Sequence, residues 1–208
     1  MEIPISQKIP AQAPPVRVAI FASGGGSNAR ALLDHFRGST VAEIVLLATE
    51  NPRSGILNFA PEYGVPAVVF PPLAHRDGAY LLELLRSYRI ELLVLAGYLK
   101  KVPDAVVQAF PQRVLNIHPS LLPAYGGKGM YGLHVHRAVI EAGESHSGMT
   151  IHYVNEVYDQ GQILFQERLP VRAGMSPEAL QMAVLKLEHK YYPSTVEKVA
   201  QTIQIADK

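Results

Sequence analysis

The sequence predicts an α/β fold, with an open, mostly parallel twisted sheet covered by helices on both faces. Short runs that are apolar throughout alternate with segments of helical periodicity, which is typical of parallel strands buried on both faces. The first apolar run leads directly into the glycine-rich turn of residues 23–28 and then into a helical segment. The chain has 208 residues, 48% apolar and 18% charged, which is an ordinary globular balance.

Five short apolar runs, bounded by glycine, proline or polar residues, predict the parallel strands. Two more strands are expected after a region where this alternation is less regular. In chain order, strands are expected at residues 16–22, 41–48, 66–70, 92–96, 113–117, 149–154 and 162–171.

Segments with apolar residues at helical spacing separate these strands, and the clearest places Leu81 and Leu85 on one face. Ser176 as N-cap and Pro177 at the first helical position predict the start of a last, long helix. The other helices are expected at residues 29–36, 56–63, 76–89, 104–110 and 134–141, and residues 125–132 form a glycine-rich loop.

Charge and cysteine content restrict the classes of function. The formal net charge is +1, so neither a nucleic acid nor a membrane surface is indicated as a partner. The absence of cysteine excludes thiol catalysis and disulfides, and it fits the cytoplasm. No apolar run approaches the ~20 residues that span a bilayer. Residues 1–15 are proline-rich without a signal-peptide pattern, so we expect a flexible tail followed by one domain over residues 16–208.

The turn Ser-Gly-Gly-Gly-Ser-Asn after the first strand predicts a phosphate site. Gly26 lets the backbone approach a ligand without a Cβ, and the following helix start offers free N–H groups to an anion. The turn is neither G-x-G-x-x-G nor a P-loop, which favours a monophosphate over NAD or ATP. The alternative is an ordinary tight turn without a ligand.

The fifth strand ends on Asn116 and His118, which are two apart and therefore point to the same side. An amide donor beside an imidazole suits an acyl transfer that develops an oxyanion. Asp159 lies in a polar stretch between the last two strands, and a carboxylate near His118 would raise the pKa of the imidazole. The alternatives are a structural histidine and a hairpin turn. Four other histidines lack the spacing of a metal site, so no metal is expected: His134, His136, His146 and His152.

The turn Gly26-Ser27-Asn28, the run Asn-Ile-His-Pro-Ser-Leu-Leu-Pro at residues 116–123 and the later Asp159-Gln160-Gly161 together resemble the phosphoribosylglycinamide formyltransferases, within the folate-dependent formyltransferase group. The resemblance covers residues 16–193. It implies a Rossmann-like formyltransferase fold. It also implies transfer of a formyl group from 10-formyltetrahydrofolate, as co-substrate, to the amine of glycinamide ribonucleotide, without a metal.

The resemblance also implies roles for individual residues. The phosphate of the ribonucleotide is expected at Gly26, Ser27 and Asn28, and its ribose hydroxyls at Glu188. Asn116 and a protonated His118 would flank the formyl carbonyl, with Asp159 keeping the histidine charged. Folate contacts are expected from the backbone of four residues after the fourth strand, and Arg76 lies near the family's arginine for the folate tail; the four residues are Leu99, Lys100, Lys101 and Val102.

The chain departs from the family pattern after Pro123, where the usual short link is replaced by the longer loop of residues 124–133. Lys128 in this loop is either a cation that closes over a substrate or a solvated surface lysine. Other formyl acceptors stay open: methionyl-tRNA, whose enzyme has a further C-terminal domain, a nucleotide sugar, and water in the hydrolase with an N-terminal regulatory domain. A nucleotide-binding module without turnover is the non-enzymatic alternative.

Overall fold

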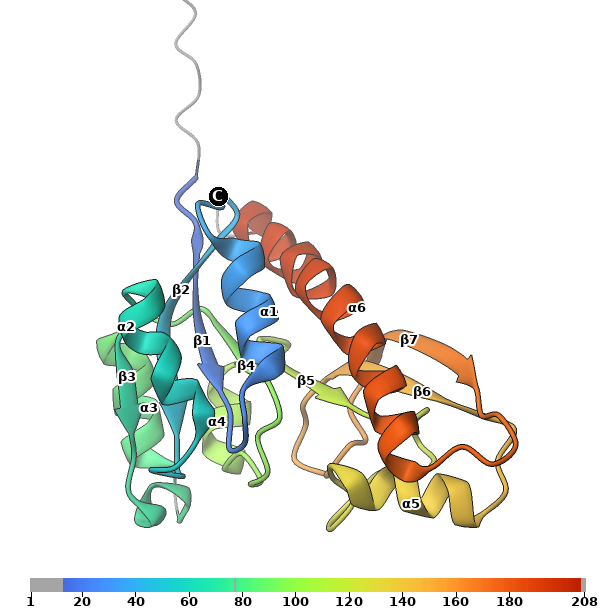
Figure 1. The fold of residues 1–208 in the computed structure, drawn as a ribbon. Coiled ribbons are helices and arrows are strands. Elements are labelled where there is room, and N and C mark those ends of the chain that lie inside the picture. Colours follow the sequence, from blue (N-terminus) through green and yellow to red (C-terminus); the bar gives the residue numbers. More distant parts are fainter. Residues whose placement is uncertain (1–12, 77, 207–208) are drawn as a thin grey trace, which may run out of the picture.

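The computed structural model describes residues 13–76 and 78–206, so most of the expected N-terminal tail lies outside the described residues. A seven-stranded sheet has the order β3-β2-β1-β4-β5-β6-β7 (Figure 1). The first five strands pair in parallel, and β6 and β7 pair antiparallel, which confirms the predicted mostly parallel sheet. The strands are β1 (Val16–Phe21), β2 (Ala42–Thr49), β3 (Ala67–Val69), β4 (Leu92–Leu95), β5 (Val114–His118), β6 (His146–Tyr153) and β7 (Ile163–Pro170).

Helices cover both faces of the sheet. Successive residues of a strand point to opposite faces, so β1 contributes to two cores. Val18 and Ile20 pack in the core that includes α1 and α6, whereas Ala19 and Phe21 pack in the core that includes α3 and α4. The helical elements are α1 (Ser27–Phe36), η1 (Gly55–Asn58), α2 (Phe59–Tyr63), η2 (Pro72–His75), α3 (Ala79–Ser87), α4 (Asp104–Ala109), α5 (Leu133–Glu141) and α6 (Pro177–Ala206).

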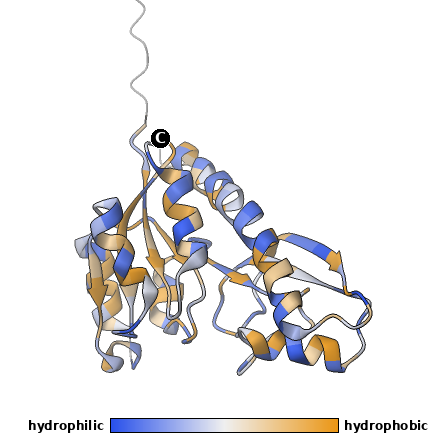
Figure 2. Cartoon of the chain, in the orientation of Figure 1, coloured by the Kyte–Doolittle hydropathy of each residue, from blue (hydrophilic) through white to orange (hydrophobic). Residues whose placement is uncertain are grey.

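The distribution of apolar residues explains why these elements stay together. Strands β1 and β3 are largely hydrophobic, whereas α1 and α6 alternate between hydrophobic and hydrophilic stretches (Figure 2). Ile20, Leu32 and Val196 are all fully buried although they come from β1, α1 and α6. Burying one such side chain contributes about 1.5–3 kcal/mol.

No helix in the described part of the chain is long and apolar enough to cross a membrane.

Several element boundaries differ from the sequence prediction, and three of the differences have a clear physical reason. Residues 56–63 divide into the 3-10 helix η1 and the short helix α2, which places Pro61 in the first turn of α2, where its missing N–H is not needed. Helix α3 begins at Ala79 and not at residue 76, because Gly78 precedes it with a left-handed φ of 78°. Strand β6 begins at His146, three residues early, because it pairs along its whole length with β7.

The strand order reverses between β1 and β4. The chain passes from β1 outward to β2 and β3, and then returns to β4 on the other side of β1. Open α/β sheets bind ligands at such a point, beyond the carboxyl ends of the strands. The turn after β1 and the end of β5 therefore belong to the same edge of the sheet.

Candidate active site

The glycine-rich turn closes on the start of α1. Gly26 is the N-cap, with a left-handed φ of 79°, and a Cβ there would lie 2.9 Å from Cε2 of Phe59. Helix α1 begins at Ser27, two residues earlier than predicted, so the backbone N–H groups of Ser27 and Asn28 belong to its first turn and have no acceptor within the helix. The turn therefore offers the unpaired donors that an anion requires.

The side chain of Asn28 joins this turn to α6. Its Nδ2 donates a hydrogen bond of 2.6 Å to Oε2 of Glu188. Both side chains are buried, and Oδ1 of Asn28 has no hydrogen-bond partner among the described residues. Burial raises the pKa of the Glu188 carboxyl, and the bond from Asn28 opposes this only in part. The predicted phosphate turn and the predicted ribose carboxylate are thus brought into contact.

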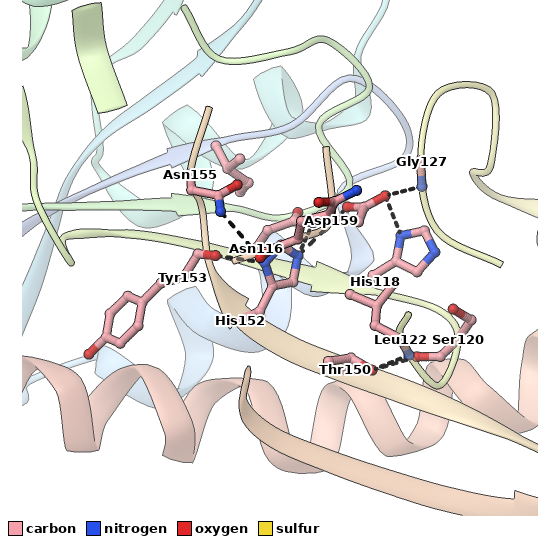
Figure 3. A network of polar contacts seen from close by, with 12 residues as sticks. Asn116, His118, Ser120, Leu122, Gly127, Thr150, His152, Tyr153, Asn155 and Asp159 are labelled. Carbon is pink, nitrogen blue, oxygen red and sulfur yellow. Dashed lines mark hydrogen bonds and ion pairs between the residues drawn. The ribbon is translucent and has the colours of Figure 1, made fainter. Parts of the chain in front are cut away.

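Strand β6 orients the amide of Asn116. The antiparallel register places Asn116 opposite His152 and His118 opposite Thr150. His152 Nδ1 lies 2.7 Å from the Tyr153 carbonyl, which accepts its proton, so His152 Nε2 is left as an acceptor. Nδ2 of Asn116 lies 3.1 Å from this Nε2 and donates to it (Figure 3). One Asn116 amide hydrogen is therefore fixed by His152, and the other stays available.

His118 and Asp159 face each other at the end of β5. His118 is only 4% exposed, and its Nδ1 lies 3.6 Å from Oδ2 of Asp159 (Figure 3). Its Nε2 donates to the backbone carbonyl of Tyr125 at 2.8 Å. Because a carbonyl only accepts, Nε2 carries the proton in the neutral ring and Nδ1 is the free nitrogen. Asp159 also lies 3.7 Å from His152 and accepts a bond of 2.8 Å from the Gly127 N–H.

The electrostatics correct one expectation from the sequence. Burial lowers the pKa of His118, and this effect exceeds the opposing influence of Asp159 and of the bond to Tyr125. The expectation that Asp159 raises this pKa above its ordinary value and keeps the ring charged was therefore wrong for the ligand-free protein. Burial also pushes the pKa of Asp159 upward, but the neighbouring His152 imidazole, the charge that His118 carries when protonated and the bond from the Gly127 N–H together outweigh it, so this pKa is lowered. The pair is a neutral imidazole beside a carboxylate.

A cavity of about 1040 Å³ joins these parts. It is lined by most of the residues predicted for the site: Ser27, Asn28, residues 99–102, Asn116, His118, Asp159 and Glu188. Two of the predicted residues do not line the cavity: Gly26, the N-cap of α1, and Arg76, which is exposed at the end of η2. In the described part of the chain, no group of three or more His, Cys, Asp or Glu residues could hold a metal ion.

Comparison with known proteins identifies the family of the chain. Residues 16–196 match the protein family described as formyl transferase.

The chain belongs to the formyl transferase family.

Two relatives and one solved structure illustrate the similarity. The chain is 46% identical to the chloroplastic phosphoribosylglycinamide formyltransferase of Arabidopsis thaliana, over 89% of this chain and 65% of that protein. It is 33% identical to the phosphoribosylglycinamide formyltransferase of Bacillus subtilis, over 88% of this chain and 94% of that protein. The crystal structure of glycinamide ribonucleotide transformylase 1 from Symbiobacterium toebii superposes with a TM-score of 0.83 at 34% identity, covering 90% and 89% of the two chains. The chain thus spans less than two thirds of the length of the plant relative.

The structure adds contributors that the sequence did not single out. His152 was considered only as a metal ligand, yet it touches both Asn116 and Asp159. Its one sequence signal is the alternation of polar Thr150 and His152 on one face of an otherwise apolar strand. The loop of residues 125–132 contributes backbone groups at its start, and Lys128, whose side chain is exposed, lines the cavity further along.

Proposed function

We propose that this chain transfers a formyl group from 10-formyltetrahydrofolate to the amine of glycinamide ribonucleotide, a step of de novo purine biosynthesis. The observation that carries the proposal is the convergence of Asn116, His118 and Asp159 on one cavity whose other end is the turn at Asn28. The names of the relatives from Arabidopsis thaliana and Bacillus subtilis support the same activity.

In this proposal the acceptor lies between α1 and α6. Its phosphate accepts hydrogen bonds from the N–H groups of Ser27 and Asn28, in the favourable field of the helix N-terminus. Its ribose hydroxyls donate to Glu188, which the 2.6 Å bond from Asn28 holds at the cavity. The same contact therefore fixes the distance between the phosphate and ribose subsites.

The folate lies at the end of β4, beside residues 99–102, which line the cavity. The N–H of Leu99 already donates to Oγ of Ser23 at 2.9 Å, so this backbone donor is occupied in the ligand-free protein. The contact from Leu99 is therefore assigned to its carbonyl. Arg76 does not line the cavity, and we keep it only as a residue that could reach a long folate tail.

The chemistry follows from the neutral His118. The amine attacks the formyl carbon, a C–N bond forms, and the carbonyl oxygen becomes an oxyanion that the available Asn116 amide hydrogen stabilises. The proton released by the attacking nitrogen passes to Nδ1 of His118, and Asp159 stabilises the resulting imidazolium. Nδ1 then returns this proton to the folate nitrogen as its bond to the formyl carbon breaks. As this bond breaks, the oxyanion re-forms the carbonyl of the formyl group, which is now bonded to the acceptor nitrogen.

The partners we propose are these two small molecules, with no nucleic acid and no membrane. The cytoplasm is the compartment we propose, which the absence of cysteine fits.

The test is an acceptor comparison with the purified chain and 10-formyltetrahydrofolate. The folate absorbance is followed after adding glycinamide ribonucleotide, methionyl-tRNA or buffer alone as the acceptor. The mass of the product is measured by mass spectrometry. We expect folate turnover only with the ribonucleotide, with one formyl group added to it. Turnover without an acceptor, or only with the tRNA, would contradict the proposal.

A further inference from the structure

The first residues of the loop touch both members of the His118–Asp159 pair through backbone atoms. The Tyr125 carbonyl accepts from Nε2 of His118 at 2.8 Å, and the Gly127 N–H donates to Oδ2 of Asp159 at 2.8 Å. Gly126 lies between these two contacts. One short segment therefore holds the imidazole and the carboxylate at the same time.

We infer that residues 125–127 set the tautomer and separation of this pair, and that Gly126 is a positioning residue of the formyl transfer. The inference rests on the proposed function and deepens it. A Cβ on Gly126 would lie 2.6 Å from Cδ2 of Leu122 and 3.2 Å from Cβ of Asp159. Gly126 does not have the left-handed backbone that favours glycine, so the effect of a Cβ here is steric. The Leu122 methyl can rotate away, whereas the close approach to Cβ of Asp159 would push the carboxylate away from its present position.

The segment is anchored where it begins, at Ala124 and Tyr125. Oγ of Ser120 donates to the Ala124 carbonyl at 2.7 Å, and the Tyr125 hydroxyl donates to Oε1 of Glu144 at 2.8 Å. Tyr125 adopts a left-handed φ of 57°, which few non-glycine residues do, and this turns the chain toward the site. These anchors fix the Tyr125 carbonyl against His118.

Each backbone contact has a chemical consequence. The Tyr125 carbonyl requires a proton on Nε2, so the neutral ring presents its lone pair at Nδ1, toward Asp159. The Gly127 N–H favours the ionised form of Asp159 and lowers its pKa. Displacing the segment would therefore mix the two tautomers of His118 and raise the pKa of Asp159, without removing any side chain from the site.

The variant Gly126→Ala tests this steric requirement in a kinetic assay. We expect kcat to fall at least tenfold while KM for both substrates stays within twofold, because the reacting pair moves and the binding contacts do not. Ala173→Gly is the control, since it makes the reverse change at an exposed loop residue that does not line the cavity. We expect its kcat within twofold of the parent. An unchanged kcat for Gly126→Ala would overturn the inference. A fall in kcat/KM that comes only from a higher KM would overturn it as well.

A second measurement needs no substrate and no active variant. With ¹⁵N-histidine labelling, NMR of the unaltered chain should show neutral His118 with its proton on Nε2, and Gly126→Ala should show a mixture of tautomers. The Gly127 amide resonance should shift with the ionisation of Asp159 and lose this response in Asp159→Asn. A proton on Nδ1, or a Gly127 resonance indifferent to Asp159, would overturn the inference whatever acceptor the enzyme uses.

Discussion

The side-chain amide of Asn28 donates a 2.6 Å hydrogen bond to the carboxylate of Glu188, which joins the start of α1 to the middle of α6. Glu188 is 7% exposed, and burial raises its pKa above the ordinary value. A carboxylate kept here at neutral pH costs stability, because the charged form has lost water and gains one hydrogen bond in return. Such a cost indicates a group retained for a ligand.

The variant Glu188→Gln should therefore stabilise the protein at pH 8. A carboxyl whose pKa is raised on folding binds its proton more tightly in the folded state, so stability falls as the pH rises from the ordinary glutamate pKa through the raised one. Removing the charge removes this loss, and Tm should rise by about 2–4 °C, the shift expected for ~1 kcal/mol.

The gain should disappear near pH 4, where the parent carboxyl is protonated, while KM for the ribonucleotide rises at pH 8, where the parent carboxylate accepts from the ribose hydroxyls. Thermal unfolding at the two pH values measures the effect, with Glu83→Gln on the exposed surface of α3 as control. An equal Tm difference at pH 4 and pH 8 would show that the carboxylate carries no burial penalty.

The variant Gly26→Val should raise KM for the ribonucleotide at least tenfold, or about 1.4 kcal/mol. The new side chain meets Phe59, and the left-handed φ of 79° disfavours any β-branched residue, so the N–H groups of the turn move. Folate affinity, measured by titration, should stay within twofold, which also shows that the variant folds. A normal KM for the ribonucleotide would remove the turn from the phosphate site.

The burial of His136 on α5 should make the protein less stable in acid. The side chain is 1% exposed, its Nδ1 has no hydrogen-bond partner in the described chain, and burial lowers its pKa to about 4. In the unfolded chain a histidine has a pKa near 6.5, so stability is lost as the pH falls from ~6.5 toward 4, by on the order of 2–3 kcal/mol.

The variant His136→Leu keeps the volume and should reduce this dependence. Urea unfolding at pH 7.5 and pH 4.5 should give a smaller difference in unfolding free energy for the variant than for the parent. His118 contributes in the same direction in both proteins, since its pKa is also lowered. If the unfolding free energy of parent and variant changed equally between pH 7.5 and pH 4.5, His136 would have to have a hydrogen-bond partner in the folded state.

The variant Asn116→Ala should lower kcat by about 10²–10³, the effect of removing one oxyanion donor. KM for both substrates should change little, because the donor meets charge that develops only in the transition state. The variant Asn116→Asp offers a second comparison, since it keeps the shape and replaces the donor with a negative charge. Full activity of either variant would exclude Asn116 from oxyanion stabilisation.

The parallel strands, the glycine-rich turn and the helix pattern could be predicted from the sequence because each leaves a local periodicity. Asn116 and His118 were found because their spacing places them on one side of a strand. His152 was not, because its place opposite Asn116 depends on the register between β5 and β6, which no local pattern encodes. The contacts of Tyr125 and Gly127 use backbone atoms, which every residue has.

The protonation state of His118 could not be predicted for a related reason. The sequence suggested a nearby carboxylate, which raises the pKa of an imidazole. How deeply the ring is buried depends on the packing of the whole sheet edge, and burial is the stronger effect here. The sign of the shift therefore needed the tertiary structure.

In the proposed mechanism Asp159 supports proton transfer by His118, and the kcat of Asp159→Asn in formyl transfer to glycinamide ribonucleotide tests this role most directly. The substitution keeps the shape and removes the charge 3.6 Å from Nδ1. We expect kcat to fall by about 10²–10⁴ with both KM values little changed, and the His118 pKa, followed by NMR, to move further below its ordinary value. Asp34→Asn, exposed on α1, should match the parent. A near-normal kcat with an unmoved His118 pKa would show that Asp159 is only a turn residue and would contradict the mechanism.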